Sequence, residues 1–69
     1  MSKEVRKLNV SNISSLRIGE RVVFEYNNQR YKTSPVVSIM VRQINGNRSG
    51  FFIFETKNTK YEICASKVA

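Results

Sequence analysis

Apolar and polar residues alternate along four segments of this chain, and turn-forming residues separate the segments. The first segment, residues 21–26, places Val22, Phe24 and Tyr26 on one face and mainly polar residues on the other. A period of two residues is typical of a β-strand with one buried face. The pattern therefore predicts a strand over residues 21–26, preceded by a turn at Gly19, where glycine permits a positive φ.

A hairpin is expected after this strand, because Asn27 and Asn28 tolerate the left-handed backbone that tight hairpin turns require. The return strand begins at Arg30 and is interrupted at Ser34-Pro35. Proline cannot donate a hydrogen bond to a neighbouring strand, and it biases the residue before it toward extended backbone. We therefore expect a bulge or a sheet edge at this point.

The return strand resumes over residues 36–43, and two more strands are expected over residues 51–56 and 59–64. The Asn-Gly pair at residues 45–46 is the strongest turn signal in the chain, and Lys57-Asn58 predicts a second short turn. Alternation predicts which residues share a face: Val37, Ile39 and Val41 lie together, opposite Val36, Ser38, Met40 and Arg42, and Tyr61 lies with Ile63.

The strand at residues 51–56 is apolar on both faces, a pattern found where both sides of a strand are covered. The N-terminal stretch from Leu8 to Ile18 offers one cover, and we expect it to form an irregular arm or a brief helical turn over one end of the sheet. A second copy of the protein offers the other cover. The interface of that homodimer would be an apolar patch of Val23, Val36, Met40, Phe51 and Ile53.

A four- to five-stranded antiparallel sheet that opens with the Gly-Glu-Arg-Val motif at residues 19–22 resembles the small SH3-like barrels. The resemblance covers residues 16–64 and implies a loop-and-strand face used for nucleic-acid or peptide recognition. An OB-like barrel ranks second, since that fold usually includes a helix and a fifth strand. We therefore expect an all-β, mainly antiparallel fold, with a flexible basic tail over residues 1–7 and one small SH3-like curved sheet or barrel over residues 8–69.

Length and cysteine content limit how this fold is stabilised. The chain has 69 residues, enough for one domain. A single cysteine, Cys64, cannot form an intramolecular disulfide, and the sequence has no Cys/His cluster to bind a metal. Oligomerisation remains as a means of burying more surface. No stretch predicts a signal peptide or a membrane span, so we expect a cytoplasmic protein that does not bind membranes.

Charge is the strongest indication of function. Twelve Lys and Arg against five Glu give a net charge of +7 and an isoelectric point near 10.1. Such a surface attracts anions, so a nucleic acid or an acidic protein is the expected partner, although a basic surface also serves solubility alone. The usual catalytic triads and carboxylate dyads are missing, because the chain has no His and no Asp and its glutamates show no paired spacing. We expect a binding protein without a cofactor rather than an enzyme, and Cys64 as a buried or half-buried structural thiol.

Nucleic-acid binding needs cations for phosphates and aromatic rings for bases. Tyr31, which lies between two cations, is the best candidate for stacking, whereas Tyr26 and Tyr61 continue the apolar faces of their strands. Core packing with the hydroxyl at the rim is the alternative for all three tyrosines. No helix long enough to read a major groove is expected, so we expect no sequence-specific binding of duplex DNA. We therefore expect binding of single-stranded or non-sequence-specific nucleic acid through one basic, tyrosine-bearing strand face. The predicted nucleic-acid-binding residues are Arg30, Tyr31, Lys32, Arg42, Arg48, Lys57 and Lys60.

Two other functions fit the sequence. Hydroxyl and amide side chains near two turns predict a site for a small phosphate-bearing ligand, although such residues also satisfy their own backbone. The residues of this alternative site are Thr33, Ser34, Thr56, Asn58 and Thr59. The apolar patch predicts instead a protein-interaction module or inhibitor that docks on an acidic protein. In style, this short, basic, cysteine-poor chain is similar to the accessory proteins of phages and other mobile elements.

Overall fold

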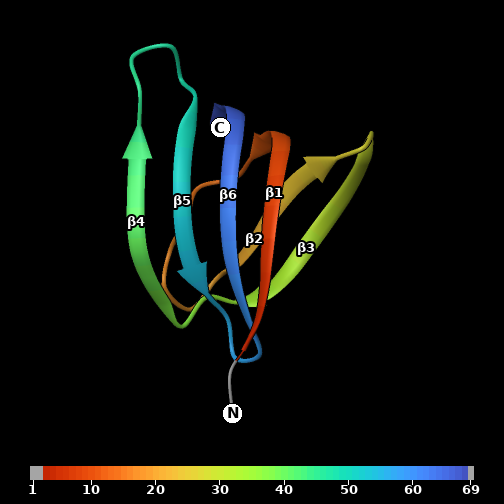
Figure 1. The fold of residues 1–69 in the computed structure, drawn as a ribbon, viewed down its shortest axis with the longest axis vertical. Coiled ribbons are helices and arrows are strands. Elements are labelled where there is room, and N and C mark those ends of the chain that lie inside the picture. The colour runs from red at the N-terminus through yellow and green to blue at the C-terminus, as the bar shows by residue number, and fades with distance from the viewer. Residues whose placement is uncertain (1–2, 69) are drawn as a thin grey trace.

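The computed structural model of the protein describes residues 3–68, and this part of the chain forms a six-stranded sheet without helices. The strands are β1 (Glu4–Ile13), β2 (Arg21–Tyr26), β3 (Gln29–Pro35), β4 (Ser38–Ile44), β5 (Gly50–Glu55) and β6 (Thr59–Val68). Their order across the sheet is β3-β2-β1-β6-β5-β4 (Figure 1). β1 and β6 are parallel, and every other neighbouring pair is antiparallel. The fold is all-β, as expected, but the sheet is mixed and open rather than an antiparallel barrel of four to five strands. Within residues 3–68, accordingly, no helix is long and apolar enough to cross a membrane.

The N-terminal segment differs most from the sequence prediction. Instead of an irregular or helical arm, residues 4–13 form β1, which lies between β2 and β6 in the middle of the sheet. The parallel ladder with β6 extends from the pair Glu4 and Thr59 to the pair Ile13 and Val68. It also extends β6 four residues beyond the expected end of the last strand.

The expected tail over residues 1–7 is also corrected in part. Residues 4–7 belong to the β1–β6 ladder, while residues 1–2 lie outside the described part of the chain. The alternation of Leu8 and Val10 with polar residues is a weak strand pattern, and no hairpin turn accompanies it, because the parallel partner lies at the other end of the sequence. Local patterns alone therefore did not predict this strand.

The β2–β3 hairpin is confirmed. Asn27 and Asn28 have φ values of 52° and 62°, the left-handed backbone of a two-residue hairpin turn. β3 lies at a sheet edge, and it also contains a bulge, because Arg21 pairs with Pro35 whereas Val23 pairs with Lys32. Both outcomes expected near the proline therefore occur together.

Val36 and Val37 connect β3 to β4, although these two strands lie at opposite edges of the sheet. So short a connection requires the sheet to curve until one end of β3 comes near one end of β4 (Figure 1). Backbone hydrogen bonds fix this corner: the Val36 N–H donates to the Glu20 carbonyl at 3.0 Å, and the Val37 N–H donates to the Glu55 carbonyl at 2.8 Å. Because the chain changes partners here, from β2 to β5, β4 begins at Ser38 rather than at Val36.

A bulge in β4 corrects the predicted faces of this strand. Ile39 pairs with Phe54, but Val41 pairs with Ile53, so Met40 is an extra residue in β4. Directly paired residues lie on the same face of a sheet. Ile39 and Val41 therefore lie on opposite faces, contrary to the regular alternation expected from the sequence.

One face of the curved sheet carries the core, and we call it the inner face. Phe52 and Phe54 of β5 lie on it and are buried, whereas Phe51 and Ile53 lie on the outer face and are half-buried. The strand that is apolar on both faces thus has one core face and one partly covered face. The buried apolar residues are Val10, Ile13, Leu16, Val22, Phe24, Val36, Phe52, Phe54, Ile63 and Ala65.

Candidate nucleic-acid interface

The edge strand β3 carries an aromatic ring on one face and two cations on the other. Tyr31 pairs with Phe24, whose buried ring marks the inner face, so Tyr31 lies on that face too. Arg30 and Lys32 precede and follow Tyr31, and alternation places their exposed side chains on the outer face. The three residues are consecutive in β3, and the structure puts the ring and the cations on opposite faces of the strand rather than on the single basic face expected from the sequence.

Tyr31 contributes to a hollow on the inner face, which we call the tyrosine hollow. It has a volume of about 150 Å³ and is lined by Arg6, Leu8, Phe24, Tyr26 and Tyr31. Tyr31 is 40% exposed, while Tyr26 and Leu8 are half-buried. The hollow therefore combines an exposed aromatic ring, an apolar floor and one guanidinium.

The ring of Tyr31 is held in place by its neighbours. It stacks on Phe24 with ring centroids 5.6 Å apart and planes inclined by 20°, and the Tyr26 ring lies 6.3 Å away. The Tyr31 hydroxyl donates a hydrogen bond of 2.9 Å to the side-chain oxygen Oε1 of Gln29. With one face against Phe24 and the side chain still 40% exposed, the ring offers a fixed aromatic surface to a ligand.

The other two tyrosines are more strongly tied to the core. Tyr61 stacks on Phe54 at 5.1 Å and meets Phe24 edge-on at 6.5 Å, so aromatic contacts cross the inner face from β3 to β5. Tyr26 and Tyr61 are half-buried and pack against the core cluster. This packing agrees with the expected continuation of the apolar strand faces and separates both residues from the more exposed Tyr31.

Sequence reasoning missed Arg6, because it assigned this residue to a tail. Arg6 and Leu8 are two residues apart in β1, so they lie on the same face of the strand. Both line the tyrosine hollow. The Arg6 Nε atom donates to Glu4 Oε1 at 3.1 Å, and both side chains are more than half exposed. The alternation of Leu8 and Val10 with polar residues, extended back by two residues, puts Arg6 on the face of Leu8, but this pattern is too weak to have predicted the strand.

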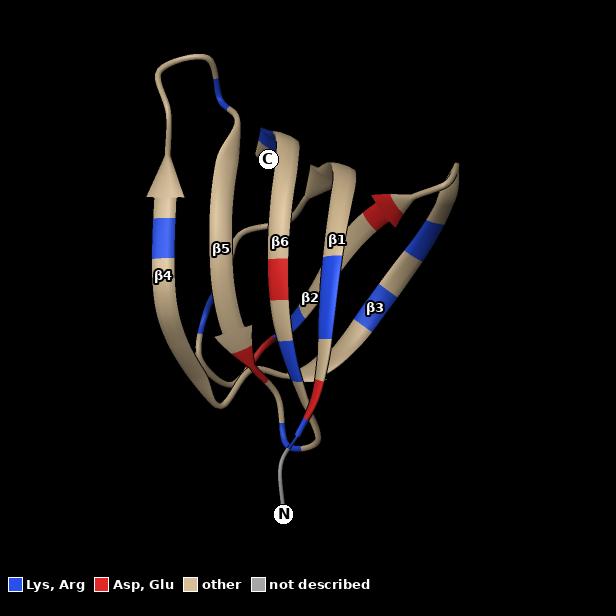
Figure 2. Cartoon of the chain, viewed as in Figure 1, with Lys and Arg blue, Asp and Glu red and all other residues tan. Residues whose placement is uncertain are grey.

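The remaining predicted cations do not join this site. Figure 2 shows Lys and Arg spread over the sheet, with two bands on β3 and others far from it. Arg48 lies in the β4–β5 turn, and Lys57 and Lys60 lie at the β5–β6 turn and the start of β6. Arg42 lies on the opposite edge strand, where it pairs with Phe52 on the inner face and donates a hydrogen bond to the Leu16 carbonyl. Regular alternation predicts Arg42 on the face opposite Ile39; the bulge at Met40 puts the two residues on the same face, and Arg42 is exposed there.

Few of the cations are neutralised within the protein. Across residues 3–68, ion pairs join Lys3 to Glu55 at 3.6 Å and Arg6 to Glu4 at 3.1 Å. The described part of the chain contains all twelve Lys and Arg, so most of them retain their charge for an external partner. The basic character inferred from composition is therefore a property of the folded surface.

Two of the five alternative ligand residues have hydroxyls that are already bonded within the fold. Thr33 is buried; its Oγ1 accepts a hydrogen bond from the Val22 N–H at 3.1 Å and donates to the Ser34 carbonyl at 2.7 Å. Thr56 is also buried, and its hydroxyl donates to the Thr59 carbonyl at 3.3 Å. These two hydroxyls stabilise a bulge and a turn. Of the other three residues, Ser34 and Asn58 are exposed and Thr59 is half-buried.

The alternative interface residues do not form one patch. Val36 is buried in the core at 1% exposure, and Val23 lies on β2, which β1 and β6 separate from β5. Phe51 and Ile53 are neighbours on the outer face, and Met40 is 47% exposed at the bulge of β4. Of the five predicted interface residues, Met40, Phe51 and Ile53 therefore remain as an apolar surface on β4 and β5.

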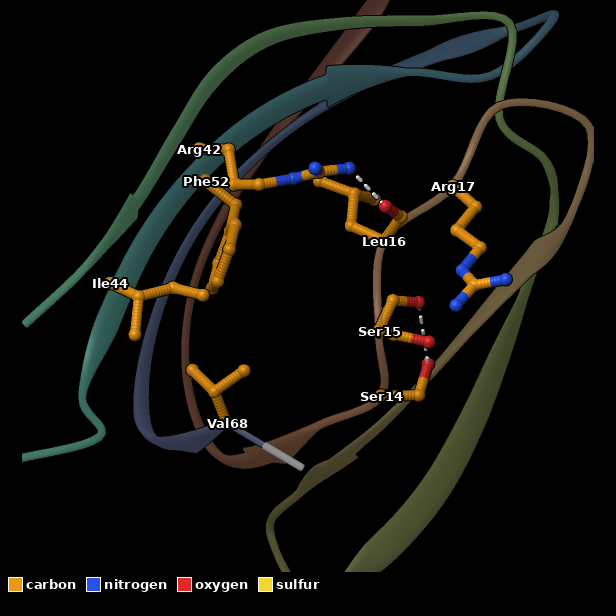
Figure 3. A pocket seen from close by; sticks show the side chains of 8 residues that line it. All are labelled: Ser14, Ser15, Leu16, Arg17, Arg42, Ile44, Phe52 and Val68. Carbon is orange, nitrogen blue, oxygen red and sulfur yellow. Dashed lines mark hydrogen bonds between the residues drawn. The ribbon is translucent and has the colours of Figure 1, made fainter.

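A larger cavity of about 250 Å³ lies between β4 and the β1–β2 connection (Figure 3). Phe52, Ile44 and Val68 form one wall of it, and Leu16 lies opposite. Its polar groups serve the fold: the Ser14 hydroxyl accepts from the Val23 N–H at 3.0 Å, and Arg42 bonds the Leu16 carbonyl. We therefore regard the smaller tyrosine hollow as the better binding site.

The described residues contain no cluster of three His, Cys, Asp or Glu side chains that would hold a metal ion. Cys64 is exposed on β6, which corrects the expectation of a buried or half-buried thiol.

Comparison with protein families, curated proteins and solved structures found no match to this chain. The function is therefore argued from the geometry of the site alone.

Proposed function

We propose that this protein is a non-enzymatic module that binds nucleic acid without sequence preference, at the β3 edge of its sheet. The observation that carries the proposal is the arrangement on β3. The exposed ring of Tyr31 lies on the inner face of this strand, and Arg30 and Lys32 lie on its outer face. Cations that meet phosphates beside an aromatic ring that meets bases are the usual elements of such a site.

The charge of the protein supports the same partner. A net charge of +7 on a chain of 69 residues attracts a polyanion over long distances and accelerates its association. Neutralisation of phosphates by Lys and Arg releases counterions from the nucleic acid, so this contribution to affinity weakens as salt rises. Stacking on Tyr31 adds a contribution of about 1–3 kcal/mol per base that depends less on salt.

The architecture favours recognition without a sequence code. Base edges in duplex DNA are commonly read by a helix in the major groove, and residues 3–68 contain no helix. The strong curvature of the sheet and the Gly-Glu-Arg-Val motif at residues 19–22, which leads into β2, support, as part of this proposal, an architectural resemblance to small SH3-like barrels. That resemblance implies a loop-and-strand binding face.

The test is a titration of fluorescent single-stranded and duplex oligonucleotides with the purified protein, at low and at physiological salt. We expect binding that weakens with salt, and a clear loss of affinity in the double variant Arg30→Gln, Lys32→Gln. The matched control is the double variant Arg48→Gln, Lys57→Gln, which also removes two exposed cations, from turns outside β3. Absence of binding even at low salt would overturn the proposal.

A second candidate function, association with a protein, rests on the difference between the two sheet edges. β3 carries Arg30, Lys32 and Pro35, residues that discourage pairing with another strand. β4 has exposed apolar residues instead: Met40 is 47% exposed and Ile44 is 56% exposed. A partner strand at β4 would persist at high salt, whereas nucleic-acid binding would not.

A further inference from the structure

We propose that the nucleic acid is single-stranded, and that one unpaired base enters the tyrosine hollow and stacks on Tyr31 while its flanking phosphates contact Arg30 and Lys32. This inference rests on the proposed function and adds to it the form of the ligand and the position of the base. The juxtaposition that carries it is a hollow on the inner face and two cations on the outer face of one edge strand.

The edge position of β3 makes this arrangement reachable for one ligand. In the middle of a sheet, side chains on the two faces of a strand are separated by the neighbouring strands. β3 has a neighbour, β2, on one side only within the described sheet. A single strand can therefore pass along this edge with its bases toward the inner face and its phosphates toward the outer face. Arg30 and Lys32, two residues apart in a strand, are separated by about 7 Å along it.

The lining of the tyrosine hollow suits a nucleobase. Tyr31 and Tyr26 supply aromatic surface, Leu8 and Phe24 form an apolar floor, and Arg6 supplies the one charged group. A guanidinium can donate hydrogen bonds to the edge of a base or lie flat against its ring. The ion pair of Arg6 with Glu4 is exposed, so Arg6 can exchange this partner at little cost.

The hollow favours an unpaired base over a base pair. In a duplex each base is covered on both faces by its stacked neighbours, so its ring becomes available only after unstacking and unpairing, at a cost of a few kcal/mol. A single strand has a much smaller cost, because its bases already exchange between stacked and free arrangements. The site therefore distinguishes the two forms through access to the ring rather than through charge, since both forms offer phosphates to Arg30 and Lys32.

The ring of Tyr31 is prepared for stacking before the ligand arrives. Its contact with Phe24 at 5.6 Å and the hydrogen bond from its hydroxyl to Gln29 restrict its rotation. A side chain that is already ordered loses less conformational entropy on binding, which increases affinity. Tyr31→Phe keeps the ring and the Phe24 contact and loses only the hydroxyl, whereas Tyr31→Ala removes the stacking surface.

The experiment compares three probes of equal phosphate number: an oligothymidylate of about ten nucleotides, the same backbone with every base removed, and a blunt duplex. For the natural protein we expect the oligothymidylate to bind about 5- to 150-fold more tightly than the abasic strand, which is the fold-change for a stacking energy of about 1–3 kcal/mol. Tyr31→Ala is expected to remove this ratio, and Tyr31→Phe to retain most of it. Lys57→Gln, remote from the hollow, is expected to leave the ratio unchanged.

A second readout reports stacking directly. A 2-aminopurine base within the strand is expected to lose fluorescence when the natural protein or Tyr31→Phe binds, but not when Tyr31→Ala binds. Circular dichroism of each variant shows whether the sheet is retained. Equal affinity for the abasic strand and oligothymidylate, or a ratio that survives in Tyr31→Ala, overturns the inference while the proposed function stands. Failure to bind all three probes at low salt overturns both, and leaves a protein partner to be sought.

Discussion

Gly50 provides the sharpest test of how the core is packed, because the structure leaves no room for a side chain there. A Cβ atom at Gly50 would lie 2.8 Å from two ring atoms of Phe52, Cε2 and Cζ, and 3.0 Å from the carbonyl oxygen of Gln43. Phe52 is 2% exposed, and its ring can relieve the contact only by moving toward the cavity that it lines, whereas the Gln43 carbonyl belongs to the backbone of the paired strand and cannot move alone. Gly50→Ala therefore forces a shift in the first residue of β5 and in the core at once.

The expected cost follows from two opposing effects. Overpacking a tight core by a methyl group costs about 1–3 kcal/mol. Replacing Gly by Ala in a strand returns about 0.5–1 kcal/mol, because alanine loses less backbone entropy on folding. We expect Gly50→Ala to lower the free energy of unfolding by about 1–2 kcal/mol. In a domain of this size each kcal/mol lost lowers Tm by about 4–8 °C.

The other two glycines serve as controls with different causes. At Gly46 no atom lies within 4 Å of the added Cβ, so Gly46→Ala is expected to be neutral or slightly stabilising. Gly19 also has open space, but its φ of 86° disfavours any side chain, so Gly19→Ala is expected to cost about 1–2 kcal/mol through the backbone. The measurement is urea unfolding of the three variants beside the natural protein.

A double variant separates the steric cause from the conformational one. Phe52→Leu shortens the side chain that the new methyl meets, so it should recover part of the cost of Gly50→Ala and none of the cost of Gly19→Ala. The coupling energy between positions 50 and 52 is expected to be about 0.5–3 kcal/mol, as for residues in contact. If Gly50→Ala unfolds at the same urea concentration as Gly46→Ala, the packing described around Phe52 is wrong.

Three further predictions concern the edge strands. Thr33→Val leaves the buried N–H of Val22 without its acceptor and is expected to cost about 1–3 kcal/mol in urea unfolding, whereas Thr33→Ser, which keeps the hydroxyl, should cost clearly less; equal losses would argue against the hydrogen bond. Lys32→Gln is expected to reduce the slope of log K against log salt by about 0.7 for a single-stranded probe, and an unchanged slope would show that Lys32 meets no phosphate. If the protein self-associates through β4, Met40→Lys should lower its mass in solution at high concentration; an unchanged mass would exclude this edge as the contact.

The parts of the fold that the sequence predicted are those with a local cause. The β2–β3 hairpin was predictable because Asn27 and Asn28 tolerate positive φ between two alternating segments. The bulge and the edge position of β3 followed from Pro35, because proline has no backbone N–H to donate to a neighbouring strand. In each case two to four neighbouring residues contain the whole physical reason.

The parts that were missed depend on residues far apart in the sequence. β1 is a strand because β6 lies beside it, and a parallel pair has no connecting turn to reveal it. The bulge at Met40 reverses the faces of β4, and regular alternation cannot indicate where such an extra residue occurs. Arg42 was consequently placed on the wrong face, and Val36 was assigned to an exposed patch although it is 1% exposed.

The candidate site also combines residues that are close in the sequence with residues that only the fold brings together. Arg30, Tyr31 and Lys32 are consecutive in one strand, so their proximity follows from the sequence, but the structure puts the ring and the two cations on opposite faces rather than on the single face that was predicted. The tyrosine hollow, in contrast, exists only when β1 brings Arg6 and Leu8 beside that hairpin. In the proposed mode of binding, contacts to phosphates depend on local structure, and recognition of a base depends on the long-range β1–β6 ladder that holds β1 in the sheet. Any change that loosens β1 should consequently abolish the preference for single strands before it abolishes binding to phosphates.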